Sequence, residues 1–283
     1  MSLDLVIQGE DIPTPDLKLL HALSGASGIV RVAGVAHQAF RLAGAEPSSC
    51  AAVAAHCSRA RLDFAYMPAA SRLSDFGLIA MDMDSTLITI ECIDELADFA
   101  GRKADVSAIT ASAMRGEIDW PESLRQRVSL LAGLDQSILQ RVYEERLRLS
   151  PGAERLLAAA KQHRISLLLV SGGFTFFTER LRARLAIDHA FSNELEILDG
   201  KLTGRVTGPL CDAEGKARHL RETAAVLSLP ADRCIAIGDG ANDLKMMESA
   251  GLSIAYHAKP VVQAKASVAI NFLGLDAVPA LFA

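Results

Sequence analysis

Apolar and polar positions in the first 74 residues switch between two periods along the chain. Segments with helical spacing of their apolar residues lie between short runs that are typical of strands. The strand-like runs cover 3–8, 29–34, 38–44 and 63–68, and the helical segments cover 14–26 and 48–62. The resulting order, β-α-β-β-α-β, predicts a ferredoxin-like α+β domain over residues 1–74, which ends in the linker PAASRLS at 68–74.

Residues 75–283 follow a different pattern. Nearly continuous apolar runs alternate with helical segments, as expected for strands that are covered on both faces of a parallel sheet. The runs cover 78–82, 165–173, 233–240, 251–256 and 266–270. This pattern predicts a doubly wound, Rossmann-like α/β domain. Two inserts interrupt it, a mostly helical segment at about 90–150 and a hairpin around Asp199-Gly200.

Chemically reactive side chains stand at the carboxyl ends of three of these runs. The tips read Asp82-Met83-Asp84-Ser85-Thr86, Ser171-Gly172-Gly173 and Gly238-Asp239-Gly240-Ala241-Asn242-Asp243. Ligands of open α/β sheets bind beyond the carboxyl ends of the strands, so the three tips are expected to converge if their strands are neighbours. Each tip alone is more simply explained by helix caps and turns, and only their joint occurrence indicates a site.

Chemistry that needs all three tips exists. Carboxylates from two tips can hold a hard divalent cation, for which Mg²⁺ is the expected ion, while backbone N–H groups at Ser171-Gly172-Gly173 receive a phosphate. The cation would reduce the repulsion between Asp82 and a phosphate dianion, so that Asp82 could act as a nucleophile. Lys216 would supply a positive charge, although by itself it is most simply a surface lysine. A dinucleotide fingerprint at 238–243 is disfavoured because an Asp replaces its third glycine.

These motifs, in this order, resemble the four motifs of the haloacid dehalogenase (HAD) superfamily of phosphotransferases. The resemblance covers residues from about 76 to the C-terminus and implies Asp82 as the nucleophile and Asp84 as the general acid and base. It further implies that Ser171, Gly172, Asn242 and Lys216 hold the phosphoryl group, and that Asp82, Asp84 and Asp239, supported by Asp243, bind Mg²⁺. An Asp at position 84 favours a hydrolase, because a carboxyl group there can activate water against the phosphoenzyme.

The helical insert at about 90–150 is expected to cover the site as a cap. Its sequence, including AMRGEIDWPESLRQRVSLLAGL, resembles the cap of superfamily members that hydrolyse phosphoserine. The resemblance implies that Glu91 and Arg127 bind the ammonium and the carboxylate of O-phosphoserine, and that Met114 and Trp120 are apolar cap contacts. Two alternatives stay open: transfer of the phosphoryl group to a small alcohol such as homoserine, and a serine-sensing regulatory protein.

The charge and cysteine content of the chain limit the classes of partner that it is expected to bind. A net charge of −5 and a pI near 5.8 argue against nucleic acid, and no segment indicates secretion or membrane insertion. The five scattered cysteines fit the reduced thiols of a cytoplasmic protein. The N-terminal segment resembles ACT-type modules, and this resemblance implies a homodimer through that segment or a response to serine.

Overall fold

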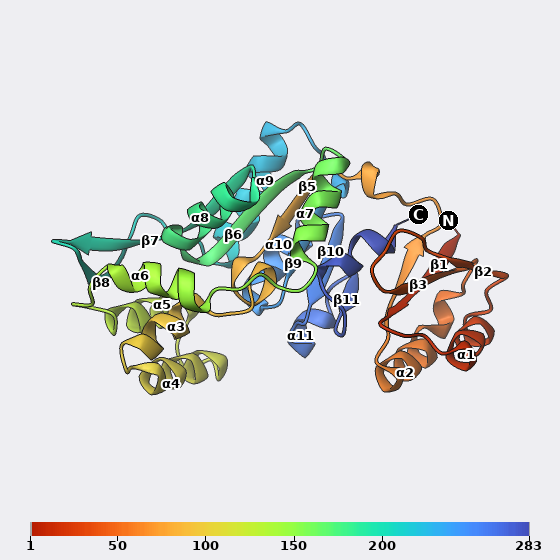
Figure 1. Cartoon of the computed structure of the whole chain (residues 1–283), viewed down its shortest axis with the longest axis horizontal. Coiled ribbons are helices and arrows are strands. Elements are labelled where there is room, and N and C mark those ends of the chain that lie inside the picture. The colour runs from red at the N-terminus through yellow and green to blue at the C-terminus, as the bar shows by residue number, and fades with distance from the viewer. Residues whose placement is uncertain (1, 283) are drawn as a thin grey trace.

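The computed structural model describes residues 2–282, apart from the side chain of Met114. Within these residues, eleven strands form one sheet in the order β2-β3-β1-β4-β11-β10-β9-β5-β6-β7-β8. The molecule is elongated, with the N-terminal βαββαβ unit at one end and the helical cap at the other (Figure 1). The sheet therefore runs through both of the regions that the sequence pattern distinguishes.

The strands and helices have the following bounds. The strands are β1 Leu3–Gly9, β2 Gly28–Arg31, β3 Gln38–Ala43, β4 Asp63–Pro68, β5 Leu78–Met81, β6 Ser166–Phe174, β7 His189–Leu198, β8 Lys201–Thr207, β9 Cys234–Gly238, β10 Leu252–Tyr256 and β11 Val268–Ile270. The α-helices are α1 Thr14–Ser24, α2 Cys50–Ala60, α3 Cys92–Phe99, α4 Lys103–Met114, α5 Trp120–Ser129, α6 Ser137–Arg141, α7 Ala153–Gln162, α8 Thr175–Leu185, α9 Ala213–Val226, α10 Leu244–Glu248 and α11 Pro260–Gln263.

The N-terminal unit has the predicted ferredoxin-like order. Its four strands are antiparallel in the order β2-β3-β1-β4, and helices α1 and α2 cover one face. Leu5 and Ile7 of β1 pack on that face with Leu20 of α1 and Val53 of α2, and all four side chains are fully buried. Alternate residues of the strands therefore supply the core that the period-two pattern predicts.

The N-terminal unit is joined to the α/β domain through its strand β4. Phe64 of β4 pairs with Ala269 of β11, and the predicted boundary after Ser74 falls in a short 3₁₀ helix, Leu73–Asp75. On the sheet face opposite α1 and α2, Val6 and Met67 pack in the same apolar cluster as the strands of the α/β domain. The two regions thus share a sheet and part of a core.

The α/β domain is a doubly wound sheet. Strands β11, β10, β9, β5, β6 and β7 are parallel, and β8 adds one antiparallel strand after the predicted hairpin turn. Alternate residues of β5 enter different cores: Ile79 and Met81 face α7 and α8, whereas Leu78 and Ala80 face α9 and α10. Burial on both faces explains why these strands appear as continuous apolar runs in the sequence.

The cap consists of α3, α4, α5, α6 and the π-helical turn Val142–Arg146. It rests on the hairpin β7–β8, because Gly133 donates a backbone hydrogen bond to Leu202 (2.8 Å) and Leu202 donates one to Leu134 (2.9 Å). Gly204 of β8 approaches the end of α5 so closely that a Cβ there would lie 2.9 Å from the Cβ of Ala132. The hairpin therefore supports the helix that carries Arg127.

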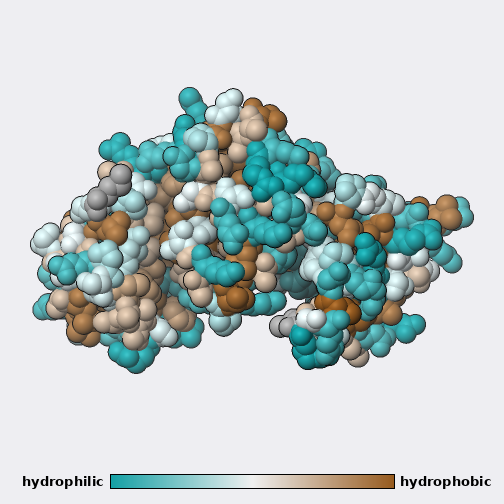
Figure 2. Space-filling view, turned by 180° about the vertical axis from the view of Figure 1, so that it is seen from behind, coloured by the Kyte–Doolittle hydropathy of each residue, from teal (hydrophilic) through white to brown (hydrophobic). Residues whose placement is uncertain are grey.

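Hydrophilic residues are spread over the whole face of the molecule in Figure 2, and a notch separates the cap from the rest of the chain along the lower edge.

No helix in residues 2–282 is long and apolar enough to cross a bilayer. The five cysteines form no disulfide within the same residues.

Candidate active site

The three strand ends that carry reactive side chains lie side by side. Strand β5 pairs in parallel with β9 on one side and with β6 on the other, so the carboxyl ends of all three strands meet at one edge of the sheet. The topology thus brings together the segments that follow Met81, Val170 and Ile237, as the sequence pattern predicts.

The first tip is a tight turn that presents Asp82. Leu87 and Ile88 donate backbone hydrogen bonds to the carbonyls of Asp82 (3.3 Å) and Met83 (3.0 Å). Ser85 has a φ of 55°, in the left-handed region that non-glycine residues adopt infrequently. One carboxylate oxygen of Asp82 accepts a hydrogen bond from the N–H of Met83 at 2.7 Å. The turn therefore fixes the Asp82 side chain at the strand end.

Lys216 lies inside the site. Its Nζ is 2.8 Å from Asp82 Oδ2 and 2.7 Å from Asp243 Oδ1, and the lysine side chain is fully buried. The two carboxylates raise the pKa of Lys216 above its usual value against the opposing effect of desolvation, so the ammonium stays charged. The simpler interpretation of Lys216 as a surface lysine is therefore wrong.

Carboxylates crowd around this ammonium. Oxygen atoms of Asp82, Asp239 and Asp243 lie within 4.8 Å of one another. Burial and the neighbouring Asp243 raise the pKa of Asp239 to about 6, and Thr86 Oγ1 donates to Asp239 Oδ1 at 3.3 Å. A cluster of carboxylate oxygens with excess negative charge matches the donor set that hard divalent cations require. The residues therefore fit a divalent metal ion.

The side chain of Asp84 has other partners. Its Oδ1 accepts from the backbone N–H of Cys92 at 2.7 Å, and its Oδ2 accepts from Ser171 Oγ at 3.1 Å. Burial raises the pKa of Asp84, so the carboxyl group is suited to hold a proton. Its carboxylate is not in the group of three described above, although the sequence motif predicted Asp84 among the metal-binding residues.

The second tip has no space for larger side chains. A Cβ at Gly173 would lie 2.6 Å from Asp84 Oδ2, and a Cβ at Gly172 would lie 2.8 Å from the ring of Trp120. Ser171 is fully buried and its Oγ also accepts the N–H of Gly173 at 2.8 Å. Trp120 of the cap therefore lies directly against the segment that the phosphate interpretation requires.

The predicted substrate contacts of the cap lie around the same site. Part of the Glu91 residue is exposed, and its carboxylate accepts a hydrogen bond from Ser85 Oγ at 2.7 Å. Desolvation of this carboxylate and the neighbouring Asp84 raise its pKa to about 8. Desolvation lowers the pKa of Arg127, whereas the nearby Asp94, Glu91 and Asp84 raise it. An acid and a base thus stand close together at the cap side of the site.

The structure gives less information on two of the predicted site residues. Asn242 is half-buried on the loop between Asp239 and Asp243. Met114 is the last residue of α4, and its side chain lies outside the described part of the structure.

Asn193 and Thr86 also belong to this region, although the sequence pattern assigned them no separate role. Asn193 is 1% exposed on β7, and its amide contacts the segments that contain Gly172 and Cys211. Asparagine is depleted in strands, so an Asn in the strand-like stretch FSNELEIL was the available signal.

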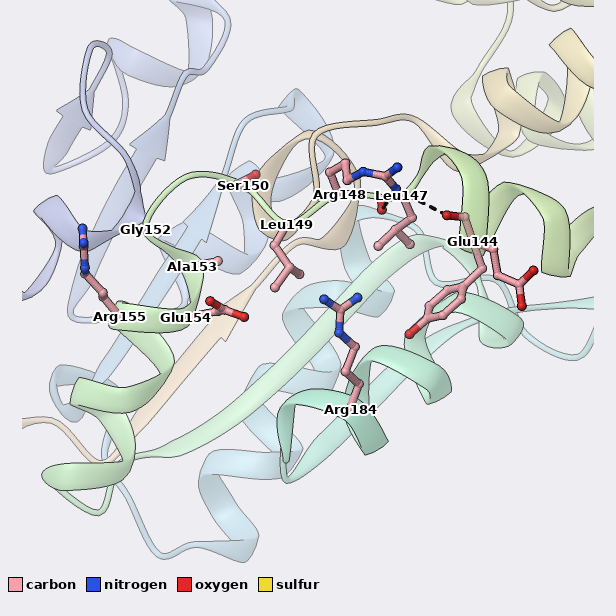
Figure 3. A pocket seen from close by; sticks show the side chains of 11 residues that line it. Glu144, Leu147, Arg148, Leu149, Ser150, Gly152, Ala153, Glu154, Arg155 and Arg184 are labelled. Carbon is pink, nitrogen blue, oxygen red and sulfur yellow. Dashed lines mark hydrogen bonds between the residues drawn. The ribbon is translucent and has the colours of Figure 1, made fainter.

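A separate cavity of about 640 Å³ lies where the cap returns to α7 (Figure 3). Arg148, Arg184, Glu144 and Glu154 line it, and Arg148 donates to the backbone carbonyl of Glu144 at 3.4 Å. None of the predicted site residues is among its lining residues. Cavity volume therefore does not identify the site that the strand tips form.

Known proteins that are similar to this chain agree with the interpretation of the site. The family model described as haloacid dehalogenase-like hydrolase matches residues 79–248, and a family described as a domain of unknown function matches residues 5–53. A phosphoserine phosphatase from a Polaromonas species is 60% identical over 210 residues, which cover 72% of this chain and 89% of that protein.

Two crystal structures are similar over nearly the whole chain. A HAD family hydrolase from Salmonella enterica serovar Typhi has a TM-score of 0.90 and 35% identity, covering 99% of this chain and 98% of the other. An unliganded probable phosphoserine phosphatase from Vibrio cholerae has a TM-score of 0.84 and 37% identity, covering 99% of this chain and 86% of the other.

Proposed function

Since this chain belongs to the haloacid dehalogenase-like hydrolase family, and within it groups with the phosphoserine phosphatases, we propose that it hydrolyses O-phospho-L-serine to L-serine and phosphate. The observation that carries this proposal is the buried contact between Asp82 and Lys216 Nζ at 2.8 Å, with Asp84 next along the same turn. The arrangement supplies a nucleophile, a cation for the phosphoryl oxygens and a carboxyl group whose pKa is raised by burial, all in one place.

Asp82 carries out the first chemical step. One of its carboxylate oxygens attacks phosphorus, the bond between phosphorus and the serine oxygen breaks, and an aspartyl phosphate forms. The departing serine oxygen takes a proton from Asp84, whose pKa is raised by burial and whose carboxyl group can therefore carry that proton. Lys216 and Ser171 stabilise the charge on the phosphoryl oxygens.

Asp84 then serves the second step. A water molecule attacks phosphorus, and the carboxylate of Asp84 takes its proton. The bond between phosphorus and Asp82 breaks, which releases inorganic phosphate and restores both carboxyl groups to their starting states. Replacing Asp84 with Asn should slow turnover by about 10²–10⁴-fold, because the amide neither gives nor takes the proton. Rapid-quench measurement of phosphoenzyme formation separates the effect on the two steps.

Mg²⁺ is the metal ion that we assign to the carboxylate cluster. Asp82, Asp84 and Asp239 would hold it, with Asp243 supporting the group. Support comes from the oxygens of Asp82, Asp239 and Asp243, which lie within 4.8 Å of one another. When bound, the ion would neutralise the carboxylates and the phosphate as they approach each other.

The cap supplies the contacts that select phosphoserine over other phosphomonoesters. Glu91 would bind the substrate ammonium, and Arg127 would bind its carboxylate through the planar guanidinium. Trp120 and Met114 would close the apolar side of the pocket. Support comes from the position of an acid, Glu91, and a base, Arg127, beside Asp84 and from the contact of Trp120 with Gly172. The product places the enzyme at the end of a serine-forming route, and we assign it to the cytoplasm.

A panel assay tests the proposed reaction. Purified protein with Mg²⁺ should release phosphate from phospho-L-serine at least about 100-fold faster than from a phosphomonoester that lacks the ammonium and the carboxylate. Chelation with EDTA should stop the reaction, and added Mg²⁺ should restore it. Added homoserine should give no phosphohomoserine, whereas its formation would favour the phosphotransferase alternative. Equal rates on all phosphomonoesters would contradict the substrate assignment.

A further inference from the structure

The side chain of Asn193 connects two segments that reach the active site from different parts of the chain. Its Nδ2 donates a hydrogen bond to the carbonyl oxygen of Gly172 at 2.7 Å, and its Oδ1 accepts one from the backbone N–H of Cys211 at 2.8 Å. The residue is 1% exposed, so water does not replace either partner easily. Asn193 therefore crosslinks the second strand tip to the segment before α9.

The ladder between β6 and β7 explains why the amide is needed on the first side. The pairing of these strands shifts its register between Val170 and Phe174, and it resumes with Phe174 opposite Asn193. Residues 171–173 lie within this irregular stretch and carry the predicted phosphate contacts. The Asn193 amide donates to a carbonyl inside the interruption, which fixes the backbone at Gly172.

The second hydrogen bond acts on the segment that carries Lys216. Cys211 directly precedes Asp212, whose side chain caps α9 by accepting the N–H of Gly215 at 2.8 Å. Lys216 follows in the first turn of α9, and its own N–H donates to the carbonyl of Asp212 at 2.8 Å. Holding Cys211 therefore helps to set where the start of α9 and its buried lysine stand.

We propose that Asn193 is a positioning residue for phosphoryl transfer, which fixes the Ser171-Gly172 segment relative to the start of α9 and so relative to Lys216. The inference rests on the proposed function, because it concerns the same phosphate-binding groups. Asparagine suits the position because one short side chain supplies both a donor and an acceptor. An Asp would keep the acceptor for Cys211 and place negative charge against the carbonyl of Gly172, and an Ala would leave both backbone groups without their partner.

The test compares Asn193→Ala and Asn193→Asp with a control on the same strand. Ser192→Ala removes a neighbouring side chain whose hydroxyl is hydrogen-bonded to Thr178 Oγ1 at 2.8 Å, on α8, and not to Gly172 or Cys211. Each full-length variant is assayed with Mg²⁺ on phosphoserine and on p-nitrophenyl phosphate, well below its melting temperature, and rates are expressed per folded molecule.

Both Asn193 variants should lose about 10- to 100-fold in kcat on both substrates, because small displacements of catalytic groups have effects of this size. The KM for phosphoserine should change by less than about threefold, because the hydrogen bonds of Asn193 go to Gly172 and Cys211 and not to Glu91 or Arg127. Ser192→Ala should stay within about twofold of the wild type on both measures.

Two results would overturn the inference. One is a lowered melting temperature with kcat retained in either Asn193 variant, and the other is failure of both variants to fold, since Asn193 would then serve the fold as a whole. The assay on p-nitrophenyl phosphate tests the role of Asn193 independently of whether phosphoserine is the substrate. If the wild type hydrolyses only the aryl phosphate, the phosphoserine proposal fails while the role of Asn193 is still measured.

Discussion

Two buried aspartates, Asp82 at the strand tips and Asp63 at the domain junction, have opposite surroundings. The carboxylate of Asp63 is 2% exposed and accepts backbone N–H groups of Asn271 (2.7 Å), Phe272 (3.2 Å) and Leu273 (2.9 Å). These donors lie in the segment that follows β11. Burial raises the pKa of Asp63, and the three donors oppose that rise.

Asp82 is similarly buried, at 4% exposed, but its neighbours are mostly charged. Burial and the nearby Asp243 and Asp239 raise its pKa, whereas Lys216 lowers it. Asp63 thus has neutral donors that suit its structural position, and Asp82 stands among carboxylates that repel it. A buried acid surrounded by other acids is therefore a candidate for chemistry, while one surrounded by backbone donors stabilises the fold.

Replacing Asp82 with Asn should have the largest effect on activity. The amide is a poor nucleophile toward phosphorus, so turnover of phosphoserine should fall on the order of 10⁴-fold or more. Stability should be unchanged or higher, because one repelling carboxylate is removed and Asp243 still pairs with Lys216. Phosphate release and thermal melting measure the two effects. Near-normal turnover in a preparation free of wild-type enzyme would falsify the covalent mechanism.

Arg127→Ala should have an intermediate effect that depends on the substrate. Loss of a charge-assisted contact to the carboxylate costs about 1.5–3 kcal/mol, or about 10- to 100-fold in kcat/KM for phosphoserine. A phosphomonoester without a carboxylate, assayed as the control, should be hydrolysed at nearly the wild-type rate. Equal losses on both substrates would instead assign Arg127 to phosphate binding or to the structure of the cap.

The pH dependence of kcat/KM should report Glu91. Burial raises its pKa to about 8 in the free enzyme, so this acid is neutral below that pH and anionic above it. Because the anion binds the substrate ammonium, kcat/KM for phosphoserine should rise about fivefold from pH 7 to 8 and level off above about pH 9, about tenfold above its value at pH 7. Glu91→Gln should lose this rise.

A phosphomonoester without an ammonium group is the control for this measurement. Its profile should be the same for the wild type and Glu91→Gln, because both proteins handle its phosphate with identical residues. If the profiles for phosphoserine are also the same in the two proteins, Glu91 does not bind the ammonium.

Asp63→Ala should have the smallest effect on activity and a clear effect on stability. Removing the acceptor leaves three buried N–H groups without their carboxylate, which should lower the free energy of unfolding by about 3 kcal/mol. Turnover at 25 °C should stay within about twofold of the wild type. Asp63→Asn, which keeps one acceptor oxygen, should lose less stability. Chemical denaturation and phosphate release measure both quantities, and a large loss of kcat in folded Asp63→Ala would abolish the contrast with Asp82.

The helices, the strands and the reactive side chains at the strand tips could be predicted from the sequence alone. Apolar runs such as 78–82 indicate buried parallel strands because both of their faces are covered, and helical spacing marks the cap. Asp82, Ser171 and Asp239 could be recognised because each stands at the carboxyl end of such a run, and parallel strands bring these ends together. Local periodicity carries this information, so no distant contact is needed to find it.

The roles of several residues could be identified only from the tertiary structure, because burial and pairing depend on segments far apart in the chain. Lys216 has the sequence surroundings of a surface lysine, yet packing of α9 against β6 and the turn Ala241–Asp243 buries it between Asp82 and Asp243. Likewise, no local pattern indicates that Asp63 binds residues 271–273, that Phe64 pairs with Ala269, or that Asn193 links two loops. These contacts form between groups that only the completed sheet brings within hydrogen-bonding distance.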